Sequence, residues 1–126
     1  MTRGITLDAG ALIGLERQDR RVLVLLERAR QTGGRVTIPA TVLAQVVRRP
    51  ERQVSLLRLA HQVTTDLVAL GRADAVSVGR LLAASSTTDV VDAHVVVCAR
   101  RTRQVVVTSD PSDLHRLDPT LRLVAI

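Results

Sequence analysis

Four aspartates occupy positions from which their carboxylates could act together, although they come from three separate parts of the chain. Asp8 follows a short apolar stretch, and Asp110 follows a run of β-branched residues. Asp89 and Asp92 stand three residues apart at the start of a long apolar segment. Clustered carboxylates are hard oxygen ligands, which select Mg²⁺ or Mn²⁺ over softer metals. Such a cation typically keeps several waters and holds a phosphate.

Each of these acids also has a purely structural interpretation. Asp8 and Asp89 could be helix N-caps, Asp92 a favourable charge in a first helical turn, and Asp110 part of a Ser-Asp-Pro turn. Carboxylates gathered at one place without a cation repel each other, so joint clustering favours a cation site. Asp113 is expected to border that site. The other aspartates are interpreted as solvated or capping residues: Asp19, Asp66, Asp74 and Asp118.

The composition excludes several kinds of chemistry. The 126 residues are predicted to form a single domain, 1–126, with a formal net charge of +6. All of the basic residues other than histidine are arginine, and the absence of lysine excludes Schiff-base chemistry and a phosphate-loop lysine. There is no Phe, Trp or Tyr, which argues against single-strand binders that stack bases on aromatic rings. The positive charge indicates a polyanionic or acidic partner, or a solvated arginine-rich surface.

The elements that must position the acids follow from hydrophobic periodicity and from Gly and Pro stops. Segment 63–70 is ambiguous and contains at most one brief strand, and 109–117 is expected to be a loop with a helical turn. The other expected strands are 5–7, 35–38, 104–108 and 121–126. The expected helices are 9–16, 22–29, 39–48, 51–62, 72–84 and one from about 89 through the apolar run that follows.

Alternation of helices with near-continuous apolar strands predicts a three-layer α/β domain with a parallel sheet covered on both faces. Ligands of such sheets bind beyond the carboxyl ends of the strands, near the point where strand order reverses. Asp8 and Asp110 each follow a strand, so both are placed on this edge. The helix that begins near Asp89 feeds the strand before Asp110, so its first turn is expected at the same edge.

The remaining reactive side chains are interpreted as structural. Cys98 lies within an apolar run and is expected to be a buried core residue. His94 is expected to be a hydrogen-bonded core or rim residue, and His61 and His115 to be surface residues. No signal-type leader and no apolar run of membrane-spanning length occurs, which leads us to expect a cytoplasmic protein with no membrane contact.

Four short motifs together resemble, in order and spacing, the PIN-domain ribonucleases, and in particular the VapC-type toxins of toxin–antitoxin pairs. They are Ile-Thr-Leu-Asp-Ala-Gly-Ala-Leu at 5–12, Pro-Ala-Thr-Val-Leu-Ala-Gln-Val at 39–46, Asp-Val-Val-Asp-Ala at 89–93 and Val-Thr-Ser-Asp at 107–110. The resemblance covers essentially the whole chain. It implies a PIN-like fold with a sheet of four or five parallel strands, a Mg²⁺- or Mn²⁺-dependent endoribonuclease activity, a homodimer, and a cognate antitoxin as partner.

The resemblance also implies roles for particular residues. Asp8, Asp92 and Asp110 match the three acids that hold the metal in that family. The family usually has a glutamate on the helix after the second strand, where this chain has Gln45. Glutamine keeps a carbonyl oxygen that can bind a hard cation but supplies no charge, and Asp89 is a candidate for the missing fourth acid.

The sequence therefore predicts hydrolysis of RNA at a metal site made by Asp8, Asp92, Asp110 and Asp89, with Gln45 as a neutral ligand or water-positioning group. Arginine side chains would hold the RNA phosphates. The alternative is a binding module of the same fold that has lost catalysis, which the glutamine favours. A receiver-type domain fits poorly without lysine, and a haloacid-dehalogenase-like phosphatase would need an aspartate where Gly10 stands.

Overall fold

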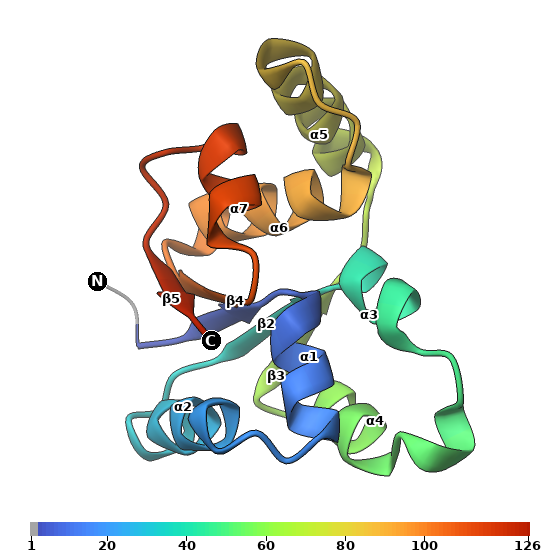
Figure 1. The fold of residues 1–126 in the computed structure, drawn as a ribbon, viewed down its shortest axis with the longest axis vertical. Coiled ribbons are helices and arrows are strands. Elements are labelled where there is room, and N and C mark those ends of the chain that lie inside the picture. The colour runs from blue at the N-terminus through green and yellow to red at the C-terminus, as the bar shows by residue number, and fades with distance from the viewer. Residues whose placement is uncertain (1–2) are drawn as a thin grey trace.

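The computed structural model describes residues 3–126, which form five strands, seven α-helices and one short 3-10 helix (Figure 1). The strands are β1 (Ile5–Leu7), β2 (Val36–Pro39), β3 (Thr65–Val68), β4 (Val105–Thr108) and β5 (Leu123–Ala125). The helices are α1 (Ala9–Glu16), α2 (Arg20–Gln31), α3 (Ala40–Val46), α4 (Val54–Ala60), α5 (Arg72–Ser85), α6 (Val90–Thr102) and α7 (Pro111–Leu117), with the 3-10 turn at Pro50–Arg52.

All five strands join one parallel sheet in the order β3-β2-β1-β4-β5. The order reverses between β1 and β4, where Leu7 is the register partner of Val107. This register continues one residue further, because the Asp8 amide donates a hydrogen bond to the Val107 carbonyl at 3.1 Å. The residues that follow β1 and β4 therefore lie side by side at the switch point, where open α/β sheets bind their ligands.

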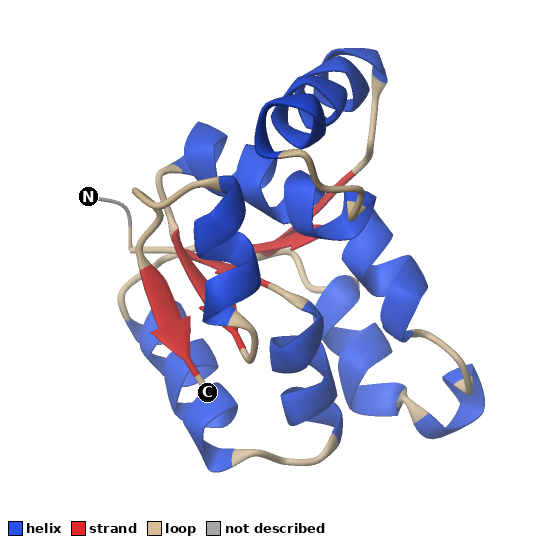
Figure 2. Cartoon of the chain, turned by 45° about the horizontal axis from the view of Figure 1, so that its top comes forward, coloured by secondary structure: helices blue, strands red, loops and turns tan. Residues whose placement is uncertain are grey.

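Helices cover both faces of the sheet (Figure 2). Helices α1, α2 and α4 lie on one face, whereas α6 and α7 lie on the other, with α5 packed outside them (Figure 1). Helix α3 stands at the carboxyl end of β2 and contacts both α1 and α6. This is the predicted three-layer α/β architecture with helices on both faces.

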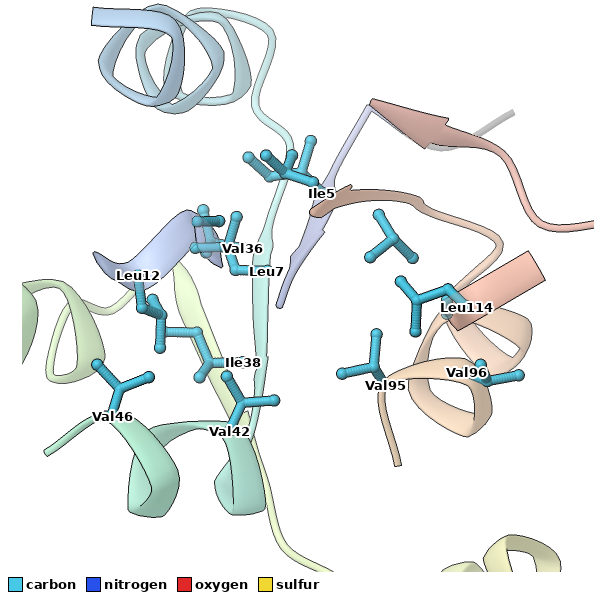
Figure 3. Packing of buried hydrophobic residues seen from close by; sticks show 14 of the residues in the cluster. Ile5, Leu7, Leu12, Val36, Ile38, Val42, Val46, Val95, Val96 and Leu114 are labelled. Atoms are coloured by element: carbon cyan, nitrogen blue, oxygen red, sulfur yellow. The ribbon is translucent and has the colours of Figure 1, made fainter. Parts of the chain in front are cut away.

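The core is made of aliphatic side chains, since the chain has no aromatic residue. Figure 3 shows the two packed layers, with Leu12 and Val46 on one side of the strands and Val95 and Leu114 on the other. Leu12, Val95 and Leu114 are completely buried. Burying such a side chain stabilises the fold by about 1.5–3 kcal/mol, so both layers contribute to holding the sheet edge that carries the acids.

Helix α6 is the central helix, as its apolar sequence predicts, and every residue from Ala93 to Ala99 is buried. Within residues 3–126, no single helix is long and apolar enough to cross a membrane. Taken together, α5 and α6 have the length and apolar composition of a membrane span, but the two helices meet at a bend of 112°.

The structure refines several expected elements. The ambiguous segment contains β3, and the expected helix over 51–62 is a 3-10 turn followed by α4. The segment 109–117, expected to be a loop with a helical turn, contains the regular helix α7 from Pro111, which suits its first turn.

The burial of individual side chains was predicted with mixed success. Cys98 and His94 are buried as predicted, and burial raises the pKa of the Cys98 thiol to about 11. Asp74 and Asp118 are buried, so the prediction of solvated side chains is wrong for both, although Asp118 does occupy the C-cap position of α7. The two carboxylates form ion pairs with arginines of α6, a tertiary contact that local sequence does not reveal.

Candidate metal and phosphate site

Asp8 is fixed between the end of β1 and the start of α1. It caps α1, and its Oδ1 accepts a hydrogen bond from the Ala9 amide at 2.7 Å. Its Oδ2 accepts a second hydrogen bond, at 2.8 Å, from the Thr108 hydroxyl at the end of β4. Only 4% of the Asp8 surface is exposed, so a buried carboxylate is held with a donor on each oxygen. The capping interpretation of Asp8 is thus correct, and it leaves the same carboxylate at the switch point of the sheet.

Thr108 joins the two acids that follow the central strands. Its buried hydroxyl donates to Asp8 and accepts a hydrogen bond, at 2.9 Å, from the Asp110 amide. The Asp110 carboxylate itself is exposed. The close approach of α1 to this loop requires Gly10, because a Cβ at that position would overlap the Ser109 hydroxyl. One hydroxyl thereby sets the backbone positions of Asp8 and Asp110 relative to each other.

The first turn of α6 brings two more carboxylates to the same edge. Asp89 is the N-cap, and its Oδ1 accepts a hydrogen bond from the Asp92 amide at 3.0 Å. Asp89 is exposed and Asp92 is half-buried. The capping interpretation of Asp89 is correct, and Asp92 is free to face the other acids.

Mutual electrostatics shows that the predicted acids lie together. The pKa of Asp92 is raised to about 7, first by burial and then by the charges of Asp89, Asp8, Asp113 and Asp110. The pKa of Asp8 is also raised, with burial as the largest cause and with smaller effects from Asp110 and Asp89, although its hydrogen bonds act in the opposite direction. Carboxylates from three chain segments therefore form one cluster of negative charge.

A cavity of about 330 Å³ opens beside this cluster. Its lining includes Asp89, Asp92 and Asp113, together with the guanidinium-bearing Arg116 of α7. Asp113, expected only to border the site, lies in it as a fifth acid. Arg116 was missed, and the signal that could have found it is its helical spacing three residues after Asp113.

Gln45 stands apart from the cavity. It lies near the end of α3, is exposed, and is not part of the cavity lining. Its helix is nevertheless joined to α6, because the hydroxyl of Thr41, one helical turn earlier, lies 2.7 Å from Nδ1 of the buried His94. The structure therefore brings the four predicted acids to one edge, but only Asp89 and Asp92 of the four line the cavity, and Gln45 lies outside it.

The donor set fits a hard divalent cation in chemical type and in charge, since it consists of carboxylates, and neighbouring carboxylates raise the pKa of Asp8 and of Asp92. Over residues 3–126, however, no three His, Cys, Asp or Glu side chains stand close enough to enclose one ion as they are. Asp89 and Asp110 are exposed and so have room to turn. Binding an ion here requires them to do so.

Solved structures share this fold. The chain superposes on VapBC2 from Rickettsia felis, bound to a DNA fragment from their promoter, with a TM-score of 0.68 and 14% identity over 97% of this chain and 98% of that one. It superposes on FitAcB from Neisseria gonorrhoeae with a TM-score of 0.67 and 14% identity, over 94% and 95% of the two chains. Both are antitoxin–toxin complexes. Identity at this level establishes a common fold alone.

These comparisons correct the family assignment made from the sequence motifs. No protein-family model matches the chain, and no curated protein sequence is significantly similar to it. The structural similarity is to chains of two antitoxin–toxin complexes, and it does not identify this chain as the toxin. The identification as a PIN-domain ribonuclease of the VapC type therefore does not hold. The fold predicted with those motifs, a three-layer α/β domain with a parallel sheet, is confirmed.

Proposed function

We propose that this chain is a divalent-cation-dependent endoribonuclease whose carboxylate cluster holds Mg²⁺ or Mn²⁺. The observation that carries the proposal is that aspartates from three chain segments meet at the switch point of the sheet, where Asp89, Asp8 and Asp110 add to the effect of burial in raising the pKa of Asp92. Strongly perturbed carboxylates beside a cavity are typical of functional sites, because a fold gains no stability from uncompensated like charges. A divalent cation would offset that repulsion.

The residues that would hold the cation are Asp8, Asp92 and Asp110, with Asp89 as a fourth acid. When bound, the cation supplies Lewis acidity that orients a phosphate and acidifies water. Asp8 contributes a preorganised carboxylate, because Ala9 and Thr108 fix both of its oxygens. Asp92, whose pKa is raised to about 7, would release its proton in order to bind the cation.

RNA is the proposed substrate because the charge of the whole chain suits a polyanion, whereas the charge of the cluster suits a cation. The net charge is +6 despite the acidic edge, so the excess arginines lie elsewhere on the molecule and can hold phosphates. A chain without aromatic rings would bind RNA mainly through its backbone, not by stacking of bases.

A cognate protein partner is part of the proposal. The fold is shared with chains of two antitoxin–toxin complexes, and an acidic cavity on a basic protein offers a partner two surfaces of opposite charge. We propose that the chain works within a toxin–antitoxin pair, as a homodimer. Expression of the chain alone should slow growth of the host more than expression of Asp8→Asn. Light scattering of the purified chain tests the homodimer.

The decisive experiment for the activity is cleavage of a structured RNA with and without Mn²⁺. Wild-type protein should cleave only with the cation, and Asp8→Asn should lose at least about 100-fold in rate, the effect typical of a group that organises a charged transition state. Asp19→Asn is the matched control. Asp19 caps α2 and lies outside the cluster, and Asn caps a helix as well as Asp does. Cation-independent cleavage, or equal loss in both variants, would contradict the proposal.

The second candidate is a binding module without catalytic activity. The exposed position of Gln45, outside the acidic cavity, favours it, because no fourth acid comes from α3. A protein of this kind would bind RNA or its partner without cleaving RNA under any cation condition. The cleavage experiment separates the two candidates directly.

A further inference from the structure

Arg116 is the one arginine among the residues that line the acidic cavity. It lies in the last turn of α7 and is exposed. Asp113 stands one turn earlier on the same helix and lines the same cavity, so the two side chains share a helix face. A basic residue is thus built into a wall that otherwise carries acids, hydroxyls and one leucine, Leu117.

Arg116 forms no ion pair with those acids. Across residues 3–126, five arginines are ion-paired with carboxylates, and Arg116 is not among them. Asp113 is close enough in sequence for the i,i+3 pairing that Arg30 and Glu27 make on α2, yet the pair is not formed. The guanidinium is therefore available to a ligand of the cavity.

We propose that Arg116 binds an RNA phosphate next to the scissile one. This inference deepens the proposed function and rests on it. A guanidinium offers paired N–H donors that match two phosphate oxygens. Without a positive charge, three carboxylates in the cavity wall would repel a polyanion, so Arg116 and the cation would share the task of attraction.

The flanking position follows from helix geometry. Asp110 precedes α7, and Arg116 lies in its last turn, six residues later. At a rise of 1.5 Å per residue, their backbones are about 9 Å apart along the helix axis. A phosphate held at the cluster and one held by Arg116 are then different phosphates of one strand. Arg116 is thus a positioning residue that orients the strand across the cluster.

An arginine in a last helical turn also interacts favourably with the helix dipole, and this alone could explain its presence. Arg28 provides the comparison, since it is an exposed arginine in the last turn of α2 and has no ion pair within residues 3–126. It does not line the acidic cavity. Loss of Arg28 therefore removes the same dipole interaction and the same net charge without touching the proposed contact.

The test is RNA binding measured without turnover, by fluorescence anisotropy of a short labelled single-stranded RNA with Mn²⁺ at several salt concentrations. All variants carry Asp8→Asn to prevent cleavage. Arg116→Gln should weaken binding about tenfold or more, as expected for a lost hydrogen-bonded charge contact. It should also reduce the slope of log K against log salt by about 0.7, the value for one single-strand phosphate contact. Arg28→Gln should leave the slope unchanged, and Arg116→Lys should keep the slope with intermediate affinity.

Equal binding by the Arg116→Gln and Arg28→Gln proteins would overturn the contact, even if wild-type protein cleaves RNA. A reduced slope for Arg116→Gln alone would support the contact, even if wild-type protein does not cleave RNA and the proposed activity falls. Absence of RNA binding by every variant would overturn both. Thermal unfolding of each variant should show the same small change for Arg28→Gln and Arg116→Gln.

Discussion

On the side of the cluster formed by β1 and β4, the Asp8 carboxylate has a hydrogen-bond donor on each oxygen, whereas on the side formed by α6 and α7 Asp92 faces other carboxylates. Both acids have raised pKa values, and burial is the first cause for each. Hydrogen bonds oppose the shift only for Asp8, whereas four neighbouring charges add to it for Asp92.

In this site, aspartate serves two purposes, one for the fold and one for function. A carboxylate with donors on both oxygens is part of the fold, so removing a donor should cost stability. A carboxylate surrounded by like charges destabilises the fold. Neutralising it should therefore reduce function and leave the free energy of unfolding equal or greater. The predictions below test this contrast between the strand side and the helix side.

The largest effect on stability is expected from Thr108→Val. The change removes the only side-chain donor to Asp8 Oδ2 that residues 3–126 provide, and it leaves a buried carboxylate oxygen without a partner. The free energy of unfolding should fall by about 1–3 kcal/mol, and RNA cleavage should fall with it. Chemical denaturation measures the first effect. Thr108→Ser, which keeps the hydroxyl, should recover most of both.

Thr37→Val is the matched control for that prediction. Thr37 is also a buried strand threonine, but its hydroxyl has no hydrogen-bond partner within the described part of the chain. Its replacement by valine should be neutral or stabilising, because no donor or acceptor is left unpaired. A loss as large as that of Thr108→Val would show that packing, and not the hydrogen bond to Asp8, accounts for the effect.

On the helix side, Asp92 should make stability fall as pH rises. Its folded pKa of about 7 lies above the ordinary 3.8, so the folded state keeps a proton that the unfolded chain releases. Without cation, the free energy of unfolding should decrease between about pH 4 and pH 7 and level off above pH 7. Mn²⁺ affinity should rise over the same range, because the ion displaces the proton.

Asp92→Asn should weaken both trends, as thermal melts and calorimetric Mn²⁺ titrations at several pH values can show. Asp66→Asn is a suitable comparison, since Asp66 pairs with Arg35 and its pKa is lowered. Unchanged pH profiles in the Asp92→Asn protein would assign the trends to another acid of the cluster.

The smallest effect is expected from Gln45→Glu. Gln45 is exposed and lies one helical turn after Thr41, whose hydroxyl contacts His94 of α6. An added charge on this face should tighten Mn²⁺ binding by less than about fivefold, because interactions of exposed charges are worth at most about 1 kcal/mol. Calorimetry measures the change. Weaker binding, or no change in binding, would mean either that Gln45 is remote from the ion or that Asp89 already supplies the charge.

Asp89→Asn separates two explanations of a null result for Gln45→Glu. Asn caps a helix as well as Asp does, so α6 should keep its stability while the cluster loses one charge. A marked loss of Mn²⁺ affinity would identify Asp89 as the acid that replaces the missing charge. An unchanged affinity would leave Asp8, Asp92 and Asp110 as the whole carboxylate set.

The sequence predicts the parts of the fold that depend on local pattern. The strand before Asp8, the strand before Asp110 and the buried helix after Asp89 all follow from apolar periodicity, whereas the strand order that sets the switch point does not. The acids come together because this topology brings strand ends and a helix start to one edge. Those predictions need no knowledge of side-chain contacts.

Contacts between distant segments could not be predicted in this way. In the sequence, Thr108 is one more β-branched residue of a strand. In the structure, its hydroxyl joins Asp8 to Asp110 at the ends of two neighbouring strands. Arg116 is one of many arginines, and only the packing of α7 against α6 places it in the cavity. In the sequence, Asp74 is an ordinary polar residue of an amphipathic helix. Its ion pair with Arg101 of α6 depends on how the two helices pack.

The central claim is that the two sides of the cluster hold one cation between them, and a crystal grown with Mn²⁺ tests it most directly through anomalous scattering. The account predicts one anomalous peak among the carboxylates of Asp8, Asp92 and Asp110, with metal–oxygen distances close to the roughly 2.0–2.1 Å of Mg²⁺ sites. The Asp89 and Asp110 side chains should be turned from their present positions. A peak elsewhere, or no peak at saturating Mn²⁺, would contradict the claim.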